Sequence, residues 1–597
     1  MVEKSRILAA GDSAIAIELG NEISEAVSAR VRSLQLLIEQ HPVKGFIECV
    51  PTYRSLMIHY DPRIVSYSSM IKELKSLETQ AGYIELPAPE VTEIPTCYGG
   101  EYGPDIETVA AHSGLSVDEV IQIHTSAEYL IYMIGFSPGF PYLGGMDPRI
   151  AAPRLESPRT KIRAGSVGIA GSQTGIYPID SPGGWQLIGW TPVRLYDPHA
   201  ENPILLKAGN YLKFKAITKE EAENAVIKNA ADSEQDMSDT QPSDADEPGF
   251  TVIKAGMLTT VQDAGRVGYQ QYGVPVSGVM DNYAYRAANL LVGNAAEAAV
   301  LEVTLLGPEI EFNRGMVIAV TGGDLTPQLN KHDLSMWRSH LVKAGDRLTF
   351  KGVKTGCRSY IAFNGGLEVP QVMGSRSTYT RGMIGGFEGR ALKAGDRLRV
   401  RKTDQNADKL NDRLISSAQM PLSDTQIIRV VPGPQDDAFT DAGISTFYRE
   451  TYTVSNESDR MGCRLEGPVI EHRTEADIIS DGIALGAVQV PGHGMPIIMM
   501  ADRQTTGGYT KIATVISADL PKMAQMKPGS RITFQQVTVK EAHQLLLELE
   551  AGLKTTAVSM ENGTKKNNLQ MMDGSPRRFR IKVGGRDYEV TLREMKE

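Results

Sequence analysis

The stretch Lys207-Ala-Gly-Asn-Tyr-Leu-Lys-Phe214 recurs along the chain in three further forms. They are Lys343-Ala-Gly-Asp-Arg-Leu-Thr-Phe350, Lys393-Ala-Gly-Asp-Arg-Leu-Arg-Val400 and Lys527-Pro-Gly-Ser-Arg-Ile-Thr-Phe534. In each form a glycine followed by Asn, Asp or Ser predicts a tight turn, and the alternating residues after it predict a strand. A second similarity joins Gln173-Thr-Gly-Ile-Tyr-Pro178 and Gln504-Thr-Thr-Gly-Gly-Tyr509. The plainest interpretation is a reused hairpin, and together the similarities favour two related, β-rich halves.

An acidic segment at residues 229–248 separates these halves. It holds seven acidic residues, no basic ones and almost nothing apolar, so it cannot bury enough surface to offset the entropy of ordering. We therefore expect a flexible linker; an acidic binding tail is the alternative, which the long segments on both sides disfavour. The patterns predict an α+β lobe at residues 1–90 and a β-barrel-like lobe at residues 91–228. Residues 249–553 form the second half.

Two further predictions concern the end of the chain. Apolar residues at helical spacing predict a helix over residues 536–553. Residues 554–597 are expected to form a loose tail, because their first part is polar. Within the tail, apolar and polar residues alternate from Arg578 to Leu592 around Gly584-Gly585. This alternation indicates a β-hairpin.

The composition limits the class of protein. The chain has 597 residues, 41% of them hydrophobic, and a formal net charge of −10, which suits a soluble globular protein and disfavours general nucleic-acid binding. No apolar run is long enough to cross a membrane, and no signal peptide is visible. The four cysteines are scattered, so we expect reduced thiols and a cytoplasmic location. The spacing of histidines and cysteines predicts no metal site.

One apparent catalytic motif fails on physical grounds. Gly135-Phe-Ser-Pro-Gly139 matches the G-x-S-x-G pattern of a nucleophile elbow. In that elbow the residue after serine donates its backbone N–H to the oxyanion hole, and here that residue is Pro138, which has none. We therefore expect a turn-rich loop that exposes the aromatic side chains Phe136, Phe140 and Tyr142.

Polar clusters in the second half supply the candidate site residues. Cations, acids and hydroxyls gather after the apolar run at residues 496–500, around residues 458–464 and at residues 374–381. Such groups of side chains suit an oxygen-rich, planar substrate. An Arg side chain can pair with a carboxylate of the substrate, and a Tyr or Asp side chain can transfer a proton. Structural ion-pair networks are the alternative. We assign catalytic roles to Asp459, Arg460, Arg503 and Tyr509, and substrate binding to Arg376, Tyr379, Gln504 and Thr505.

These stretches make the chain resemble a fusion of two bacterial proteins, 5-oxoprolinase subunits B and C. The pair is also described as allophanate-hydrolase-like subunits 1 and 2, and is similar to the carboxyltransferase domain of urea carboxylase in the urea amidolyase family. The resemblance covers about residues 5–225 and 250–550. It rests on stretches such as Gly135-Phe-Ser-Pro-Gly-Phe-Pro-Tyr-Leu-Gly-Gly145, Ser181-Pro-Gly-Gly-Trp-Gln-Leu-Ile-Gly189, Thr259-Thr-Val-Gln-Asp-Ala-Gly-Arg266, Ser458-Asp-Arg-Met-Gly462 and Asp502-Arg-Gln-Thr-Thr-Gly-Gly-Tyr509. One departure is Trp190, which stands where the resemblance leads us to expect Arg.

The resemblance implies a fold and a site. The fold class is α+β and β-rich, with a cyclophilin-like β-barrel lobe and a smaller α+β lobe in each half, and with an active site near the interface of the halves. If the Arg expected at position 190 touches an anion in relatives, this chain must supply the charge elsewhere. The first half adds four substrate-binding candidates, Gln173, Thr174, Tyr177 and Trp185.

The resemblance also implies chemistry on a small amide or lactam. One activity is ATP-dependent opening of 5-oxoproline to glutamate with the separate A subunit of 5-oxoprolinase. The second is biotin-dependent carboxyl transfer to a urea-like amide, with carboxybiotin presented by a separate carrier and made by a biotin carboxylase. A third interpretation is a kinase-inhibitory binding module, which explains the second half poorly. The tail hairpin resembles strands that precede a biotin-carrier domain, although the carrier domain itself is absent from the tail.

Overall fold

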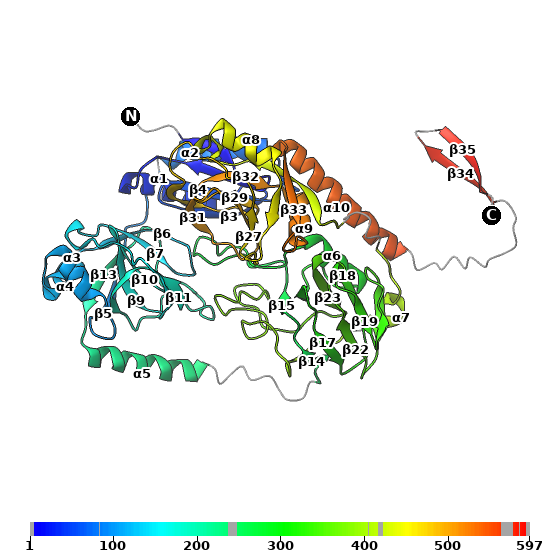
Figure 1. Ribbon diagram of the computed structural model, residues 1–597, viewed down its shortest axis with the longest axis horizontal. Helices are drawn as coiled ribbons and strands as arrows, with labels where there is room; N and C mark the ends of the chain where they lie inside the picture. The colour runs from blue at the N-terminus through cyan, green and yellow to red at the C-terminus, as the bar shows by residue number, and fades with distance from the viewer. Residues whose placement is uncertain are drawn as a thin grey trace. The chain divides into compact units, whose positions relative to one another are not determined.

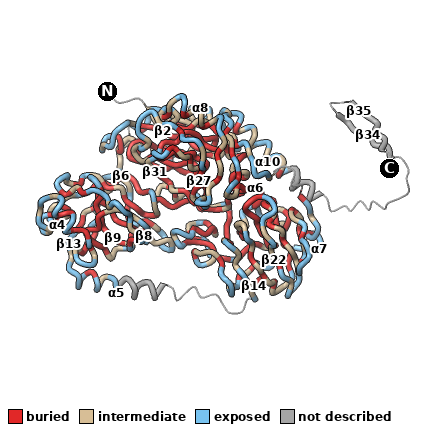
Figure 2. The backbone as a smooth tube through the Cα atoms, in the orientation of Figure 1, coloured by how far each residue is buried: buried red, intermediate tan, exposed pale blue. Residues whose placement is uncertain are grey.

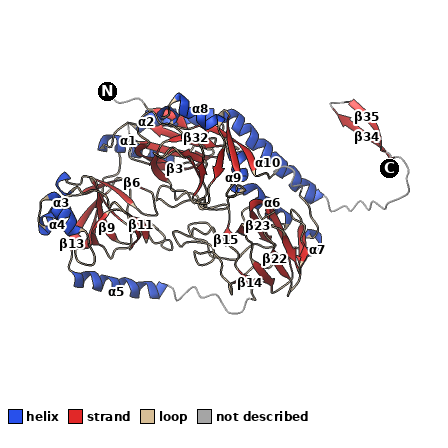
Figure 3. Cartoon of the chain, in the orientation of Figure 1, coloured by secondary structure: helices blue, strands red, loops and turns tan. Residues whose placement is uncertain are grey.

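The computed structural model describes residues 5–82, 84–236, 247–403, 405–415, 422–562, 577–583 and 586–592. The chain divides into two compact units, Met1–Leu553 and Lys554–Glu597. Figures 1 and 3 show that strands dominate the first unit and that helices flank its sheets.

The first lobe is an antiparallel sheet in the order β1-β2-β4-β3, packed against two helices. Ser24 caps the first helix by accepting a hydrogen bond from the Val27 N–H, and Leu34 and Ile38 bury its inner face. Strand β4 is buried along nearly its whole length. The elements are β1 Arg6–Ala9, β2 Ala14–Glu18, α1 Glu25–Gln40, β3 Phe46–Pro51, β4 Ser55–Tyr60 and α2 Tyr67–Ala81.

The second lobe is a seven-stranded sheet in the order β10-β9-β12-β5-β13-β6-β7. Its edge strands β10 and β7 lie in contact, so the sheet curls into a nearly closed barrel. The elements are β5 Val91–Tyr98, α3 Ile106–Ser113, α4 Val117–Ser126, β6 Tyr129–Ile134, β7 Pro141–Gly144, β8 Arg159–Ile162, β9 Ser166–Ala170, β10 Gln173–Ile176, β11 Ser181–Gly183, β12 Gln186–Trp190, β13 Tyr211–Ala216 and, after the barrel, α5 Lys219–Asp236.

The third lobe begins the second half and contains a six-stranded and a five-stranded sheet. Helix α6, capped by Asp281, packs on strands β18 and β23. The elements are β14 Phe250–Lys254, β15 Leu258–Gln262, α6 Asn282–Leu291, β16 Val300–Thr304, β17 Glu309–Phe312, β18 Met316–Asp324, β19 Pro327–Leu329, β20 His332–Asp333, β21 Ser339–Val342, β22 Arg347–Phe350, β23 Thr355–Phe363, β24 Arg397–Leu398 and α7 Ala407–Leu410.

The fourth lobe is a closed seven-stranded barrel. The strand pair β28–β31 stands outside the barrel ring as a small sheet of its own. The elements are β25 Thr425–Pro432, α8 Asp441–Arg449, β26 Tyr452–Val454, β27 Gly462–Glu466, β28 Asp477–Gly482, β29 Ala487–Gln489, β30 Ile497–Met499, β31 Thr506–Tyr509, β32 Lys511–Val515, α9 Leu520–Ala524 and β33 Arg531–Gln536.

The two barrels share one topology. Read from β30, the closed ring runs β30-β29-β32-β25-β33-β26-β27, which matches β10-β9-β12-β5-β13-β6-β7 strand for strand in chain order. In both barrels the first and last strands pair in parallel, and the separate pair β8–β11 corresponds to β28–β31. The β-rich α+β class with two related halves is therefore confirmed.

The repeated turn that suggested this relation has the same geometry in all four copies. The backbone carbonyl of the first lysine accepts a hydrogen bond from the N–H of the residue three positions later. Asn210 donates to Lys207 in this way, and Ser530 donates to Lys527. The intervening glycine has a φ near +90°, for example +86° at Gly209 and at Gly529, which L side chains rarely adopt. The second similarity does not mark equivalent positions, because Gln173 begins β10 whereas Gln504 precedes β31, the counterpart of β11.

Two helices extend past boundaries that the sequence predicted. Helix α5 reaches Asp236 and so includes the first residues of the expected linker at 229–248. Residues 229–236 contain neither Gly nor Pro, the residues that disfavour a helix most strongly. Residues 237–246 lie outside the described residues. Helix α10 spans Val539–Asn562 instead of 536–553. It continues because residues 553–562 contain neither Gly nor Pro, and the single interior Gly552 weakens a helix without ending it.

The second unit contains a strand pair. Strands β34 Arg577–Val583 and β35 Arg586–Leu592 pair antiparallel, with Arg577 opposite Leu592. The pair lies where the alternating sequence predicts a hairpin. Residues 563–576 and 593–597 of the expected tail lie outside the described residues.

Buried residues occupy the interior of each lobe of the first unit (Figure 2). The core of the first barrel continues into the second half, because Val274, Val372, Tyr379 and Ile384 pack in the same apolar cluster as the barrel strands. Among the described residues, no helix combines the length and the apolar character that crossing a membrane requires.

Candidate active site

A chain of buried polar contacts joins the two halves. Glu48 on β3 accepts hydrogen bonds from the Gln270 N–H (3.0 Å) and side-chain amide (2.9 Å). The side-chain carbonyl oxygen of Gln270 then accepts one from the Arg503 guanidinium at 2.7 Å. Arg503 also donates to the Ile483 carbonyl at 3.0 Å. Both partners of Arg503 are neutral, so its buried positive charge is held in place without direct neutralisation.

The electrostatics of Arg503 follow from this arrangement. Burial lowers its pKa to about 10, and the nearby Glu48 carboxylate partly opposes the shift. His59, opposite Glu48 in the β3–β4 ladder, has a buried Nε2 without a hydrogen-bond partner among the described residues. Burial lowers the pKa of His59 to about 3, so this imidazole is neutral. The His59 side chain of β4 therefore adds no charge beside Arg503.

Gln270→Leu tests the importance of this contact chain. The change leaves the Arg503 guanidinium and one Glu48 oxygen short of a buried partner, so we expect a loss of about 1–3 kcal/mol of stability. The matched control is Gln271→Leu, which removes only a contact with Gln35. Thermal unfolding of the full chain measures both. Equal unfolding midpoints for the two variants would contradict the role given to Gln270.

Arg460 holds three segments of the second half together. Its guanidinium forms a two-pronged pair with Asp502 (3.0 and 3.1 Å), a further pair with Glu302, and a hydrogen bond to the Gly278 carbonyl. Burial alone would lower its pKa, but Asp502 and Glu302 raise it. Nearly all its donors bind protein groups, so this geometry favours a positioning role.

A second buried cation, Lys511, lies at the start of β32. Its side chain is 1% exposed, and its Nζ lies 3.8 Å from an Asp481 oxygen and 3.5 Å from the Tyr509 carbonyl. Asp481 accepts hydrogen bonds from Ser55 of the first half, from Gln435 at 3.3 Å and from the Gly482 N–H at 2.9 Å. Burial lowers the pKa of Lys511, which the Asp481 charge partly opposes.

Unused polar atoms surround this pair. Gln489 stands opposite Lys511 in the β29–β32 ladder, so their side chains share one face of the sheet. The Gln489 amide nitrogen, the Gln435 amide oxygen and the Thr505 hydroxyl are buried and have no hydrogen-bond partner among the described residues. Buried polar atoms are nearly always paired in folded proteins, so each exception marks a place for a bound water or ligand. We call Lys511, Asp481, Gln435 and Gln489 the Lys511 cluster.

The first half also sets the charge around the Lys511 cluster. Arg54 and Glu18 form an ion pair at 3.4 Å, with side chains only 9% and 6% exposed. Both influence the pKa of Lys511, in opposite directions. The cluster therefore combines one ammonium donor, one carboxylate acceptor and free amide groups in a nearly neutral setting. An amide or lactam offers a matching carbonyl acceptor and N–H donor.

Aromatic side chains of the first barrel line the same junction. The Phe136 N–H donates to the Thr506 hydroxyl of β31 at 3.1 Å, and the Tyr142 hydroxyl interacts with Thr506 and Ser480. Burial raises the pKa of Tyr142 to about 12, so it stays a neutral donor. The expectation of exposed aromatics holds for Phe136, at 44%, but is wrong for Phe140, at 5%, whose ring packs on Tyr142.

The predicted residues of the first half divide into two groups. Gln173 donates to the Tyr53 hydroxyl at 3.1 Å, and Trp185 packs edge-on against Phe140; both belong to the aromatic side of the junction. Tyr177 is buried beside Trp185. Thr174 lies inside the barrel, where it bonds to His124 and to the Gly168 carbonyl, so its contacts are those of a core residue.

The predicted residues of the second half are likewise dispersed. Asp459 forms an ion pair with Arg381 at 3.0 Å, in which both side chains are about half exposed. Tyr379 packs in the core shared with the first barrel. Tyr509 ends β31 opposite Asp477 and is 42% exposed. Gln504 and Thr505 follow Arg503 at the junction, whereas Arg376 lines a separate pocket of the third lobe.

A cationic side chain lies next to Trp190, the residue found where the resemblance led us to expect Arg. The Trp190 ring is buried, and its Nε1 donates to the Ala164 carbonyl at 2.7 Å. The guanidinium of Arg163 lies 4.2 Å from the ring centroid, a cation–π contact. A positive charge therefore stands beside the position where the resemblance led us to expect Arg.

Sequence reasoning missed the Lys511 cluster. The available signal was a lone charged residue at the edge of an apolar strand: Lys511 before Ile-Ala-Thr-Val, and Asp481 after Ile-Ile-Ser. Such residues are rarely buried without a partner or a function. Their approach depends on the pairing of distant strands, which the sequence alone does not reveal.

Comparisons with known proteins match both halves of the chain. Residues 5–206 match the family model "Carboxyltransferase domain, subdomain C and D", and residues 272–536 match "Carboxyltransferase domain, subdomain A and B". The C subunit of 5-oxoprolinase from Escherichia coli K12 is 43% identical over 292 residues, which cover 49% of this chain and 92% of that protein. The B subunit of 5-oxoprolinase from Bacillus subtilis 168 is 47% identical over 231 residues, which cover 37% of this chain and 96% of that protein.

A solved structure shows the two halves in a single chain. The crystal structure of TTHA0988 superposes with a TM-score of 0.75 at 33% identity, covering 87% of this chain and 99% of that chain. The expected resemblance is thus confirmed in both halves. The chain belongs to the carboxyltransferase-domain family, and it joins homologues of the B and C subunits of 5-oxoprolinase in one polypeptide.

Proposed function

We propose that this chain is the fused B–C component of an ATP-dependent 5-oxoprolinase, which opens 5-oxoproline to glutamate together with a separate A subunit. The observation that carries the proposal is the Lys511 cluster, where a buried ammonium and a carboxylate meet among unpaired amide groups. The homologues of the two halves are named as subunits of this enzyme, which supports both the substrate and the need for a partner.

The chemistry assigned to the cluster starts from the lactam. The Lys511 ammonium and the free Gln489 amide N–H polarise the lactam carbonyl, because developing negative charge on oxygen is stabilised by preorganised donors. Asp481 accepts a proton from the attacking water or holds the ring N–H. The β28–β31 strand pair carries Asp481 and contacts the first half through Ser55 and the Phe136 N–H.

ATP does not fit the Lys511 cluster. A triphosphate needs several cations, whereas here Lys511 faces Asp481, and Arg54 faces Glu18. ATP, when bound, supplies the phosphoryl group that activates the lactam. The cluster handles only the amide, and the phosphates bind elsewhere in the assembly.

The pH dependence of Lys511 tests its role through two signals of opposite sign. Because its pKa is lower in the folded state, the unfolded state binds more protons between the folded pKa and the unfolded value. The stability contributed by this group therefore rises as pH rises through that window. Activity falls over the same range, because the ammonium is lost. Urea unfolding and activity measured across this pH range check both trends, and Lys511→Met should abolish this part of the stability profile.

Reconstitution tests the proposed function. The purified full chain, a homologue of the A subunit, ATP and 5-oxoproline are mixed, and glutamate is measured. We expect glutamate only when all four are present. A control reaction replaces the chain with separate B and C subunits, which shows that the A subunit is competent. Glutamate in the control but none with the fused chain would contradict the proposal.

Carboxyl transfer is the second candidate, because both matching family models describe a carboxyltransferase domain. The same residues suit it: Asp481 accepts the amide proton, and the Gln435 and Gln489 side chains offer an acceptor and a donor to a ureido ring. Carboxybiotin, when bound, supplies the carboxyl group. To test this function, the chain is incubated with a carboxylated carrier and urea or a related amide, in the absence of the A subunit. Transfer of labelled carboxyl to the amide would support it.

A further inference from the structure

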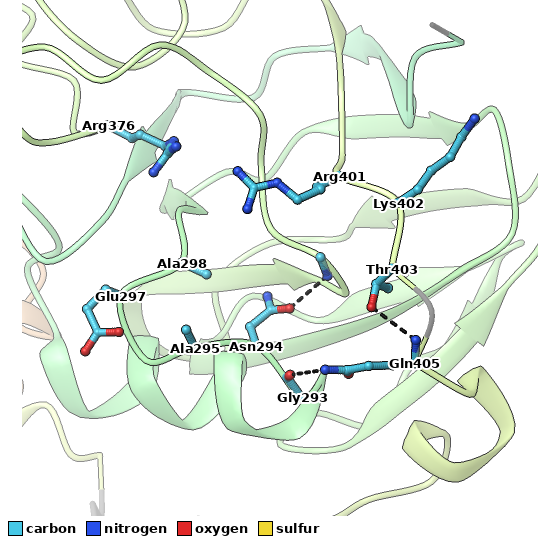
Figure 4. Close-up of a pocket in the computed structure, with 11 residues that line it drawn as sticks. Gly293, Asn294, Ala295, Glu297, Ala298, Arg376, Arg401, Lys402, Thr403 and Gln405 are labelled. Atoms are coloured by element: carbon cyan, nitrogen blue, oxygen red, sulfur yellow. Dashed lines mark hydrogen bonds between the residues drawn. The ribbon is translucent and has the colours of Figure 1, made fainter.

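The third lobe contains an open pocket of about 460 Å³ beyond the C-terminal end of α6. Three cationic side chains, Arg376, Arg401 and Lys402, and one acidic side chain, Glu297, belong to its lining. In Figure 4 the Arg376 and Arg401 guanidinium groups point toward each other, while the Glu297 carboxylate and the Lys402 ammonium both point away from them. The pocket lies in a different lobe from the Lys511 cluster.

Arg376 is fixed so that its charged end faces this space. Its Nε donates to the Val369 carbonyl at 3.0 Å, and its backbone N–H donates to Asp263 at 2.6 Å. In the described part of the chain, no carboxylate lies within ion-pair distance of the Arg376 or Arg401 guanidinium. Two guanidinium groups that face each other repel, and an anion between them removes this repulsion.

The floor of the pocket is built from hydrogen-bonded backbone. The Asn294 side chain accepts from the Gly365 N–H at 2.8 Å, and the Gln405 side chain donates to the Gly293 carbonyl at 3.0 Å (Figure 4). Gly365 has φ +96°, and a Cβ there would stand 2.1 Å from the Arg401 carbonyl oxygen. Glycine therefore lets the Arg401 segment lie close enough to face Arg376.

We propose that this pocket binds the phosphate group of a soluble ligand. The two guanidinium groups that face each other supply two positive charges, and the one described carboxylate of the lining, that of Glu297, points away from them. Paired guanidinium groups match the oxygen geometry of phosphate, and a dianion gains more from them than a singly charged carboxylate. Phosphate binding here is independent of whether the chain opens 5-oxoproline, because it occurs in another lobe.

Equilibrium dialysis of the full chain with radiolabelled inorganic phosphate tests the site. We expect saturable binding that weakens with added salt, and a loss of at least tenfold in affinity for Arg401→Gln. Arg399→Gln is the matched control: it removes the same charge from the same stretch outside the lining, and we expect less than a twofold change. Unfolding midpoints of both variants establish that they remain folded.

Competition identifies the source of the phosphate. ATP that displaces phosphate better than inorganic tripolyphosphate assigns the site to a nucleotide, whereas displacement only by small phosphate esters assigns it to a phosphorylated metabolite; both support a phosphate site. Three results would overturn it: no saturable phosphate binding at millimolar concentration, equal effects of the Arg401 and Arg399 substitutions, or displacement by acetate as effective as displacement by phosphate.

Discussion

Replacing Arg460 with alanine is expected to lower the stability of the chain by about 3–5 kcal/mol, because breaking a buried ion pair leaves uncompensated buried charge. Asp502 and Glu302 are 5% and 1% exposed, so water cannot solvate the carboxylates that lose their partner. Glu302 would keep its bonds from the Tyr360 hydroxyl and the Met280 N–H, which limits the loss without abolishing it. Urea unfolding of the full chain, followed by circular dichroism, measures the change.

Arg381→Ala is the control for Arg460→Ala. It also removes an Arg–Asp pair of the second half, but this pair is about half exposed, and such pairs contribute at most about 1 kcal/mol. If the two variants unfold at the same urea concentration, Arg460 does not hold the three segments of the second half together. An Arg460→Ala protein that is stable yet inactive would instead support the catalytic role predicted for Arg460.

Replacing Lys511 with methionine is expected to reduce turnover by about 10²–10³-fold, the usual loss when one donor to a developing oxyanion is removed. Methionine keeps the volume of the aliphatic stem and removes only the ammonium. Glutamate formation by the chain with the A subunit, ATP and 5-oxoproline measures the effect. An unchanged turnover would remove Lys511 from the proposed site.

A second variant separates catalysis from folding. Lys511→Met leaves Asp481 without its nearest cation, so the single variant loses stability as well as chemistry. The double variant Lys511→Met/Asp481→Asn removes the unpaired charge, and we expect it to recover stability while staying inactive. Recovery of turnover in the double variant would contradict a catalytic role for the cluster.

Local sequence predicted the main features of the fold. The four turn-strand copies become strands β13, β22, β24 and β33, because glycine at a positive φ and alternation act within a few residues. Helix ends were less well predicted: α10 runs past Leu553, since no Gly or Pro follows within the next nine residues. The relation between the barrels was indicated by the turns, although the Gln173 and Gln504 stretches suggested a wrong alignment.

The candidate site was predicted only in part. The stretch from Asp502 to Tyr509 was predicted to contain site residues, and Arg503 does lie at the junction of the halves, but Lys511 was not among the predicted residues. Arg460 and Asp459 looked equivalent in sequence. In the structure Arg460 is buried and pairs with Asp502, whereas Asp459 is about half exposed and pairs with Arg381. Burial separates them, and burial depends on packing against segments that lie far away in the chain.

Residue order within short stretches was enough to predict the strands, their turns and the family of the two halves. Which charges meet is instead a property of the folded chain. Ser55 and Asp481 are 426 positions apart yet share a hydrogen bond, and Arg376 faces Arg401 across a pocket. The physical reason is that electrostatic interactions depend on distance and burial in space, and the pairing of sheets brings together residues whose separation along the chain carries no such information.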